Sequence, residues 1–281
     1  MGGFDPTQPD FIMAENDEIS RLSANHDIIK DSMPGGSLIL PPIDFSASPR
    51  RILDSATANG LWLRDFASSV ADSSNHTFIG CDIASADLPS EHPANFQYQT
   101  QDINEPWPPD FASSFDFVHQ RLVFGGYPDT KNIVQNLSAL VKPGGWIQLI
   151  EIEDKADPDD GPAVQNYIQL MRDTFGAIGA RFGDINKAKG WLQEAGFVNL
   201  QEKLIEIKYG ARNPEADLAR KGVQMNKQVA TPLSKFAKTL PQEKMTLSHE
   251  TLDSLPEDLS AELTERGGAV YLRAVWGQRP N

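Results

Sequence analysis

Residues 51–62 read Arg51-Ile52-Leu53-Asp54-Ser55-Ala56-Thr57-Ala58-Asn59-Gly60-Leu61-Trp62. The segment starts as an apolar strand that ends in an acid, continues as a turn of small residues, and leads into a helix. A strand, a tight turn and a helix in this order bring backbone N–H groups to the carboxyl edge of a parallel sheet. The segment therefore predicts an α/β fold with a ligand site at that edge.

Outward from this segment, strand-like and helix-like stretches alternate. We expect further strands at 77–82, 96–99, 115–120 and 146–151, helices at 61–70 and 130–141, and a break at Lys142-Pro143-Gly144-Gly145. Strands separated by helices favour right-handed crossovers and a parallel sheet with helices on both faces. Apolar spacing also predicts an N-terminal helix at 15–30, a long strand at 198–209 and a closing strand at 269–276.

The organisation predicted for residues 1–281 is one domain in three parts. Residues 1–48 form an N-terminal helical extension, 49–210 and 267–281 form the core, and 211–266 form a helical cap in which prolines interrupt the helices. The extension and the cap are expected to cover the sheet rather than to form an independent domain.

Charge and cysteine content narrow the class of protein. Lys and Arg number 25 and Asp and Glu number 39, so the net charge is −14, which repels nucleic acid. Cys81 is the only cysteine, and no internal disulfide can form. The N-terminus resembles no signal peptide and no apolar stretch could cross a bilayer, so we expect a soluble cytoplasmic protein, most simply a monomer. The histidine spacing predicts no metal site.

Three acids stand at the ends of successive predicted strands, Asp54, Asp82 and Asp102. Carboxylates on three strand ends suit a nucleoside whose hydroxyls and amines need acceptors, and they would repel a pyrophosphate. A nicotinamide enzyme would instead carry a glycine-rich G-x-G-x-x-G turn. We therefore expect S-adenosylmethionine (SAM) at this edge.

Each acid has an expected role toward that cofactor. Asp54 would reach the ammonium group or orient the turn, Asp82 would accept from both ribose hydroxyls, and Asp102 would accept from the adenine amine while Ile103 packs on the ring. His119 and Gln120 end the fourth strand, where the sulfonium would lie. The predicted cofactor set also contains Arg21, Ser55, Ala56, Asn59, Gly60, Ile83 and Asn104.

The chain resembles the Rossmann-like SAM-dependent methyltransferases, in particular those of fungal secondary metabolism. The resemblance covers roughly residues 15–200 and the last strand, and it lies in an acid-led small-residue turn, an acid ending the second strand, and these segments: E-I-S-R-L-S-A-N-H (18–26), L-I-L-P-P-I (38–43), G-L-W-L-R-D-F-A (60–67), F-D-F-V-H-Q-R (115–121), K-P-G-G-W (142–146) and D-D-G (159–161). It implies a seven-stranded, mostly parallel, doubly wound sheet with one antiparallel strand. It also implies S-methylation of the thiols of a reduced epidithiodiketopiperazine of the gliotoxin type.

One departure from the family pattern lies in the turn. Where the family has its first two turn glycines, this chain has Ala56 and Ala58, and only Gly60 remains. A positive φ at either alanine would cost roughly 1–2 kcal/mol. We expect both alanines to keep a negative φ and SAM still to bind.

Methyl transfer is an in-line displacement that needs alignment and close approach more than a base. His119 and Glu151 are the candidate bases, since each ends a central strand. Alternatively, the backbone carbonyl of His119 holds the methionine ammonium while its ring packs, and Glu151 bonds nearby backbone. A thiol acceptor needs little help, so no catalytic base is assigned.

Aromatic side chains could line an acceptor pocket between the sheet edge, the N-terminal helix and the cap. The candidates are Phe11, Phe124, Tyr127, Tyr167 and Phe175, with ordinary core packing as the alternative for each. The expected acceptor is a small metabolite bearing a thiol. The other possibilities are O- or N-methylation of a small metabolite, and a methyltransferase-like regulator of secondary metabolism.

Overall fold

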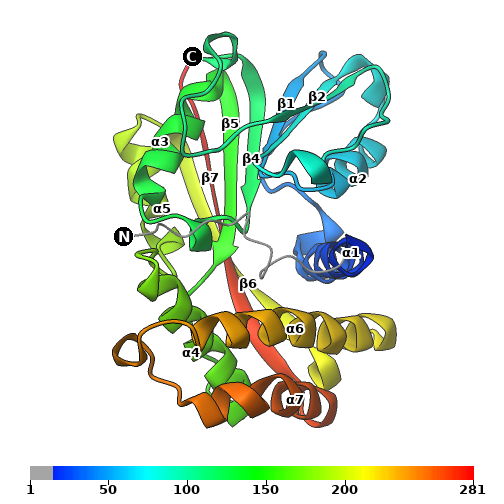
Figure 1. The fold of residues 1–281 in the computed structure, drawn as a ribbon. Helices are drawn as coiled ribbons and strands as arrows, with labels where there is room; N and C mark the ends of the chain where they lie inside the picture. Colours follow the sequence, from blue (N-terminus) through cyan, green and yellow to red (C-terminus); the bar gives the residue numbers. More distant parts are fainter. Residues whose placement is uncertain (1–14) are drawn as a thin grey trace.

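A seven-stranded sheet forms the centre of the molecule (Figure 1). The computed structural model describes the backbone from residue 15 to 281 and side chains from residue 18 onward. The strand order is β3-β2-β1-β4-β5-β7-β6. β7 runs antiparallel to β5 and β6, and all other pairs are parallel. The predicted α/β architecture with one antiparallel strand is confirmed. The strands are β1 Arg51–Ser55, β2 Thr77–Asp82, β3 Phe96–Thr100, β4 Phe115–Arg121, β5 Val141–Ile152, β6 Val198–Tyr209 and β7 Gly268–Gln278.

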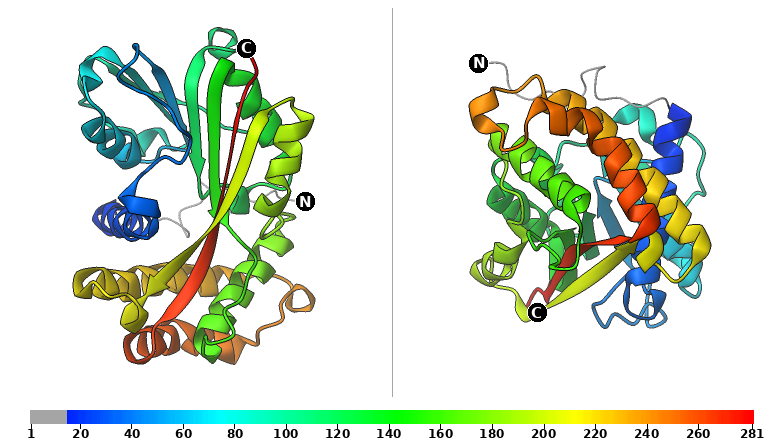
Figure 2. Two further views of the ribbon diagram at one scale, coloured as in Figure 1. Left: turned by 180° about the vertical axis from the view of Figure 1, so that it is seen from behind. Right: turned by 90° about the horizontal axis from the view of Figure 1, so that it is seen from below.

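Alternate residues of the central strands are buried on opposite faces, as expected for a sheet covered on both sides. Ile52 and Phe117 belong to the core under α2 (Leu61–Ser69), whereas Leu53 and Val118 belong to the core under α3 (Thr130–Leu140) and α5 (Ile185–Glu194). Figure 2 shows helices on both sides of the sheet.

The helices that extend beyond the sheet gather at one end of it. In Figure 1 the arrow of β5 points toward α1 (Glu15–Ser32) and α6 (Ala216–Ala237), so both helices lie at the carboxyl edge of the parallel strands. Helices α4 (Pro162–Ala177) and α7 (His249–Glu265) pack beside α6. The three-part division of the chain stays a prediction.

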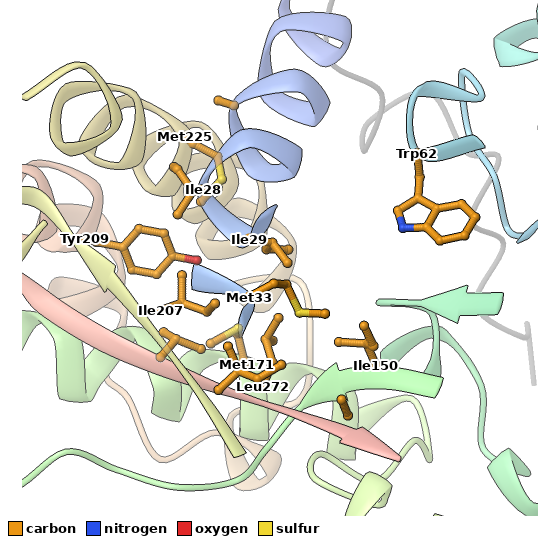
Figure 3. Close-up of a cluster of buried hydrophobic side chains, with 14 of the residues drawn as sticks. Ile28, Ile29, Met33, Trp62, Ile150, Met171, Ile207, Tyr209, Met225 and Leu272 are labelled. Atoms are coloured by element: carbon orange, nitrogen blue, oxygen red, sulfur yellow. The ribbon is translucent and has the colours of Figure 1, made fainter. Parts of the chain in front are cut away.

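The N-terminal helix is held to this end by apolar contacts. One buried cluster joins α1 to the elements beneath it (Figure 3). It contains Ile28 and Ile29 of α1, Met33 directly after α1, Met225 of α6 and Tyr209 of β6. A Cβ at Gly222 would lie 2.9 Å from the Tyr209 ring, so the close approach of α6 to β6 depends on that glycine. Through these contacts α1 is fixed over the strand ends.

One expectation about breaks in the chain is wrong, and another is confirmed only in part. Strand β5 begins at Val141, before Lys142-Pro143-Gly144-Gly145, because Val141 pairs with Phe115 and a register shift takes up the irregular residues. Helices α6 and α7 run through Pro232 and Pro256 without interruption, whereas Pro241 lies in the break between them as expected. Proline costs a helical hydrogen bond, and the packing of both helices compensates for that loss.

Candidate functional site

A cavity of about 350 Å³ opens at the carboxyl ends of β1, β2 and β4. Its walls come from the turn after β1, the ends of the neighbouring strands, and helix α1. Within the described part of the chain no residue of the 211–266 segment lines it. The lining residues are Glu18, Arg21, Leu22, Asn25, His26, Asp54, Ala56, Thr57, Ala58, Asn59, Leu61, Trp62, Asp82, Ile83, Gln101, Ile103, His119, Arg121, Leu122, Val123 and Tyr127.

The turn after β1 differs from the expectation for its alanines. Ala56 has φ of 55° and Ala58 has φ of 48°, so both are left-handed and the predicted negative values are wrong. Long-range hydrogen bonds hold the conformation: the Thr57 N–H donates to the Cys81 carbonyl at 2.9 Å, and the Ala58 N–H donates to Asp82 Oδ2 at 2.7 Å. The turn thus keeps the glycine-type backbone although it carries two methyl groups.

Asp54 is the centre of a buried polar contact. Its Oδ1 lies 2.7 Å from His119 Nδ1, and its Oδ2 accepts from the Thr57 hydroxyl at 2.7 Å. The His119 ring stacks on Trp62 with ring centroids 3.7 Å apart. Burial lowers the pKa of His119, although the hydrogen bond to Asp54 opposes this effect. The ring is therefore neutral, and its Nε2 has no hydrogen-bond partner among the described residues.

Asp82 lines the cavity and accepts two backbone N–H groups, from Ala58 and from Ala84. Burial raises its pKa, and the backbone hydrogen bonds oppose the rise. Asp102 itself does not line the cavity, whereas its neighbours Gln101 and Ile103 do. The Asp102 carboxylate accepts from the hydroxyl of Tyr127 at 3.1 Å, and Tyr127 lies in the wall.

Glu151 and Gln120 contact each other, and neither lines the cavity. Glu151 Oε1 accepts from Gln120 Nε2 at 2.5 Å and from the Val123 and Phe124 N–H groups at 2.5 Å and 3.0 Å. Burial raises the pKa of Glu151 to about 7, against those hydrogen bonds. The alternative in which Glu151 bonds nearby backbone matches this geometry.

The other predicted residues divide between the cavity wall and the interior. Arg21, Asn59 and Ile83 line the cavity, whereas Ser55, Gly60 and Asn104 do not. Of the predicted acceptor residues only Tyr127 lines it. Phe124 and Tyr167 are buried in the core, Phe175 is partly buried against Phe182, and Phe11 lies outside the described residues.

A polar cluster on the helix side of the cavity was not predicted. His26 of α1 contacts Asp65 of α2 at 2.8 Å and Arg121 of β4 at 3.2 Å, and Lys30 contacts the same Asp65 at 2.7 Å. Two signals could have indicated it. His26 and Lys30 are four residues apart on one helix face. Arg121 follows His119 by two positions, so both side chains lie on one face of the strand.

The described residues contain no group of three potential metal ligands. Among the helices with described positions, none combines the length and apolar character needed to cross a bilayer.

Comparison with known proteins assigns the chain to a family. A family model described as a methyltransferase domain matches residues 24–202. The N-methyltransferase gliN of Aspergillus fumigatus is 33% identical over 273 residues, which cover 95% of each chain. The N-methyltransferase sirN of Leptosphaeria maculans is 32% identical over 270 residues, which cover 95% of this chain and 93% of that one. The fold is also similar to that of Haemonchus contortus phosphoethanolamine N-methyltransferase 2 in complex with SAM, with a TM-score of 0.51 at 14% identity over 92% of this chain and 53% of that one. The chain therefore belongs to the methyltransferase-domain family, as a SAM-dependent methyltransferase of fungal secondary metabolism.

Proposed function

We propose that this methyltransferase transfers the methyl group of SAM to a nitrogen atom of a small secondary metabolite. The observation that supports this most is one cavity in which the acid-led turn, Asp82 and helix α1 all share the wall. A cavity of about 350 Å³ whose walls come from the strand ends and from helix α1 suits a nucleoside on one side and an acceptor on the other.

The residues at the strand ends fit the cofactor. Each Asp82 oxygen accepts one backbone N–H and keeps a lone pair, so the carboxylate can still accept from ribose hydroxyls. Ile103 is buried in the wall and offers an apolar surface for the adenine ring. Asp54 is fully engaged with Thr57 and His119, so its role would be to orient the turn.

When bound, SAM supplies an electrophilic methyl group on a sulfonium. The work of the chain is to hold the acceptor in line with that group and to exclude water. The neutral His119 ring lines the cavity, and Trp62 stacked on it keeps it in place. His119 Nε2, which has no partner among the described residues, would receive a proton from a nitrogen acceptor.

Nitrogen is favoured because gliN and sirN are both named N-methyltransferases. The thiol acceptor expected from the sequence is the second candidate. It is favoured by the engagement of Glu151 with backbone N–H groups, because this candidate base is then not free to take a proton from an acceptor. A thiol with a pKa of about 8.5 is a few per cent thiolate at neutral pH and needs no such base.

The test compares acceptors directly. Purified protein is titrated calorimetrically with S-adenosylhomocysteine, and SAM is then incubated with small amides and amines, with reduced dithiols and with phenols. Methylated products are detected by mass spectrometry. Methylation of nitrogen supports the proposal, methylation of the dithiol alone moves the assignment to S-methylation, and methylation of phenols alone refutes both. An Asp82→Ala variant should bind S-adenosylhomocysteine at least about tenfold more weakly, since hydrogen bonds to a charged group contribute about 1.5–3 kcal/mol.

The cytoplasmic location, the monomeric state and the absence of a nucleic-acid partner stay predictions.

A further inference from the structure

Arg121 is a cation without an acidic partner in the wall of the cavity. It ends β4, and its side chain is partly buried. Among the described side chains its one hydrogen bond is from Nη2 to His26 Nδ1 at 3.2 Å, and it forms no ion pair. Burial lowers the pKa of Arg121 to about 10, while the charge of Asp54 opposes the shift. The protein therefore places a positive charge in the cavity wall, where its burial is costly, without pairing it with an acid.

A chain of side chains fixes the position of this guanidinium. His26 is 3% exposed, its Nε2 lies 2.8 Å from Asp65 Oδ2, and Lys30 holds both oxygens of Asp65 at 2.7 Å and 2.9 Å. A guanidinium has only donors, so His26 Nδ1 must accept and Nε2 must carry the proton that is donated to Asp65. His26 therefore acts as a neutral acceptor that orients Arg121 without cancelling its charge.

The second arginine of the cavity shows the contrast. Arg21 forms a bidentate ion pair with Glu18 at 2.5 Å and 2.8 Å. The guanidinium of Arg21 thus has its acidic partner within α1. The remaining N–H groups of Arg121 have no partner among the described residues. A planar fork with unused donors suits a carboxylate or a carbonyl oxygen.

We infer that Arg121, positioned by His26 and Asp65, is the anchor for a carboxylate or carbonyl oxygen that enters the cavity. The inference rests on the proposed function, because the proposed reaction would bring two oxygens of this kind into the cavity. One is the carboxylate of the methionine part of the cofactor, and the other is an oxygen of the acceptor close to the methylated atom.

The test uses the full chain and the variants Arg121→Met and Arg121→Lys. Calorimetry gives the Kd for S-adenosylhomocysteine and for 5′-methylthioadenosine, which lacks the amino-acid part. Steady-state kinetics give KM and kcat for an accepted substrate. Arg220→Met is the control, because Arg220 is an exposed arginine of α6 whose ion-pair partner is Asp217. Arg121→Met should weaken binding of one ligand at least about tenfold, since a charged hydrogen bond contributes about 1.5–3 kcal/mol.

The pattern of losses identifies the source. A higher Kd for S-adenosylhomocysteine with an unchanged Kd for 5′-methylthioadenosine assigns the oxygen to the cofactor. A higher KM with unchanged Kd values assigns it to the acceptor. Arg121→Lys should lose less than Arg121→Met, because it keeps the charge but not the fork. If neither the Kd values nor KM move in either variant, the inference is wrong.

A second pair of variants covers the case in which Arg121→Met does not fold. His26→Gln can still accept from Arg121 and donate to Asp65, whereas His26→Phe can do neither. The Gln variant should therefore retain more binding of the same ligand than the Phe variant, and equal losses would contradict the inference. Failure of the wild-type protein to bind S-adenosylhomocysteine would instead refute the proposed function, so the two failures are distinguishable.

Discussion

His119 Nδ1 lies 2.7 Å from Asp54 Oδ1, and both side chains are buried at 1% and 2% exposure. The two residues are direct partners in the parallel pairing of β1 and β4. The other oxygen of Asp54 accepts from Thr57, so one carboxylate ties the turn after β1 to the end of β4. The geometry of the cavity wall depends on this link.

Replacing Asp54 with Asn should lower the free energy of unfolding by about 2 kcal/mol. The carboxylate uses one oxygen for Thr57 and the other for His119, whereas the amide of Asp54→Asn has one oxygen and no charge. One contact therefore loses its accepting oxygen, and neither remains charge-assisted. Urea denaturation measures the change. Asp110→Asn, at an exposed position, is the matched control and should leave the free energy within about 0.5 kcal/mol of wild type. Equal values for the two variants would show that the buried contact contributes nothing.

Glycine at positions 56 and 58 should stabilise the protein. Each alanine has a positive φ, which costs roughly 1–2 kcal/mol, and glycine removes that strain at the cost of about 0.5–1 kcal/mol of unfolded-state entropy. Ala56→Gly and Ala58→Gly should therefore each raise the free energy of unfolding by up to about 1 kcal/mol in a urea titration.

The control for this prediction has the opposite sign. Ala195 lies just after α5 with φ of −76°, where glycine relieves no strain. Ala195→Gly should destabilise the protein by about 0.5–1 kcal/mol. If all three variants destabilise it equally, the turn alanines are not strained.

Much of the sheet could be predicted from local pattern. The segment 198–209 and the strands 77–82 and 115–120 carry apolar periodicity that does not depend on distant residues, and the structure has strands there. The conformation of Ala56 could not be read this way, because it depends on hydrogen bonds from neighbouring Thr57 and Ala58 to the end of β2. Local preference alone favours a negative φ for alanine.

The cavity wall was predicted best where it follows the strand ends, and Arg21 and Tyr127 are predicted residues that line it elsewhere. The turn, Asp82 and Ile103 lie at those ends and line the cavity. Local spacing places His26 and Arg121 each on one face of its own element, but it does not predict their contact, which joins residues 95 positions apart. Of the aromatic residues predicted for the acceptor side, Phe124 and Tyr167 are instead buried in the core, where their size fills volume.

Removing the Glu262 carboxylate should weaken the junction of α4 with α7. Helix α4 begins after Gly161, which has no capping side chain, and Glu262 of α7 accepts from the Ala163 and Val164 N–H groups at 3.0 Å and 3.1 Å. Glu262→Ala should lower the free energy of unfolding by about 1–2 kcal/mol, as the loss of a helix cap does. Glu265→Ala, at an exposed position near the end of the same helix, should cost less than about 0.5 kcal/mol. Similar losses in the two denaturation curves would contradict a capping role.

Replacing Glu151 with Gln should change how stability depends on pH. Burial raises the pKa of Glu151 to about 7 from its ordinary value of 4.5, so the folded state binds the proton more tightly than the unfolded chain does. The contribution of protonated Glu151 to the free energy of unfolding is therefore complete below about pH 4.5 and is lost as the pH rises toward 7.

The amide introduced by Glu151→Gln would stay neutral at every pH and could still accept from the Val123 and Phe124 N–H groups, so this variant should match wild type at pH 5. At pH 8 it should be more stable by about 1–3 kcal/mol, because each pKa unit corresponds to about 1.4 kcal/mol. Thermal and urea denaturation at both pH values measure the difference, with the exposed Glu265→Gln as the control. A difference from wild type that is the same at pH 5 and pH 8 would show that Glu151 does not titrate in this range.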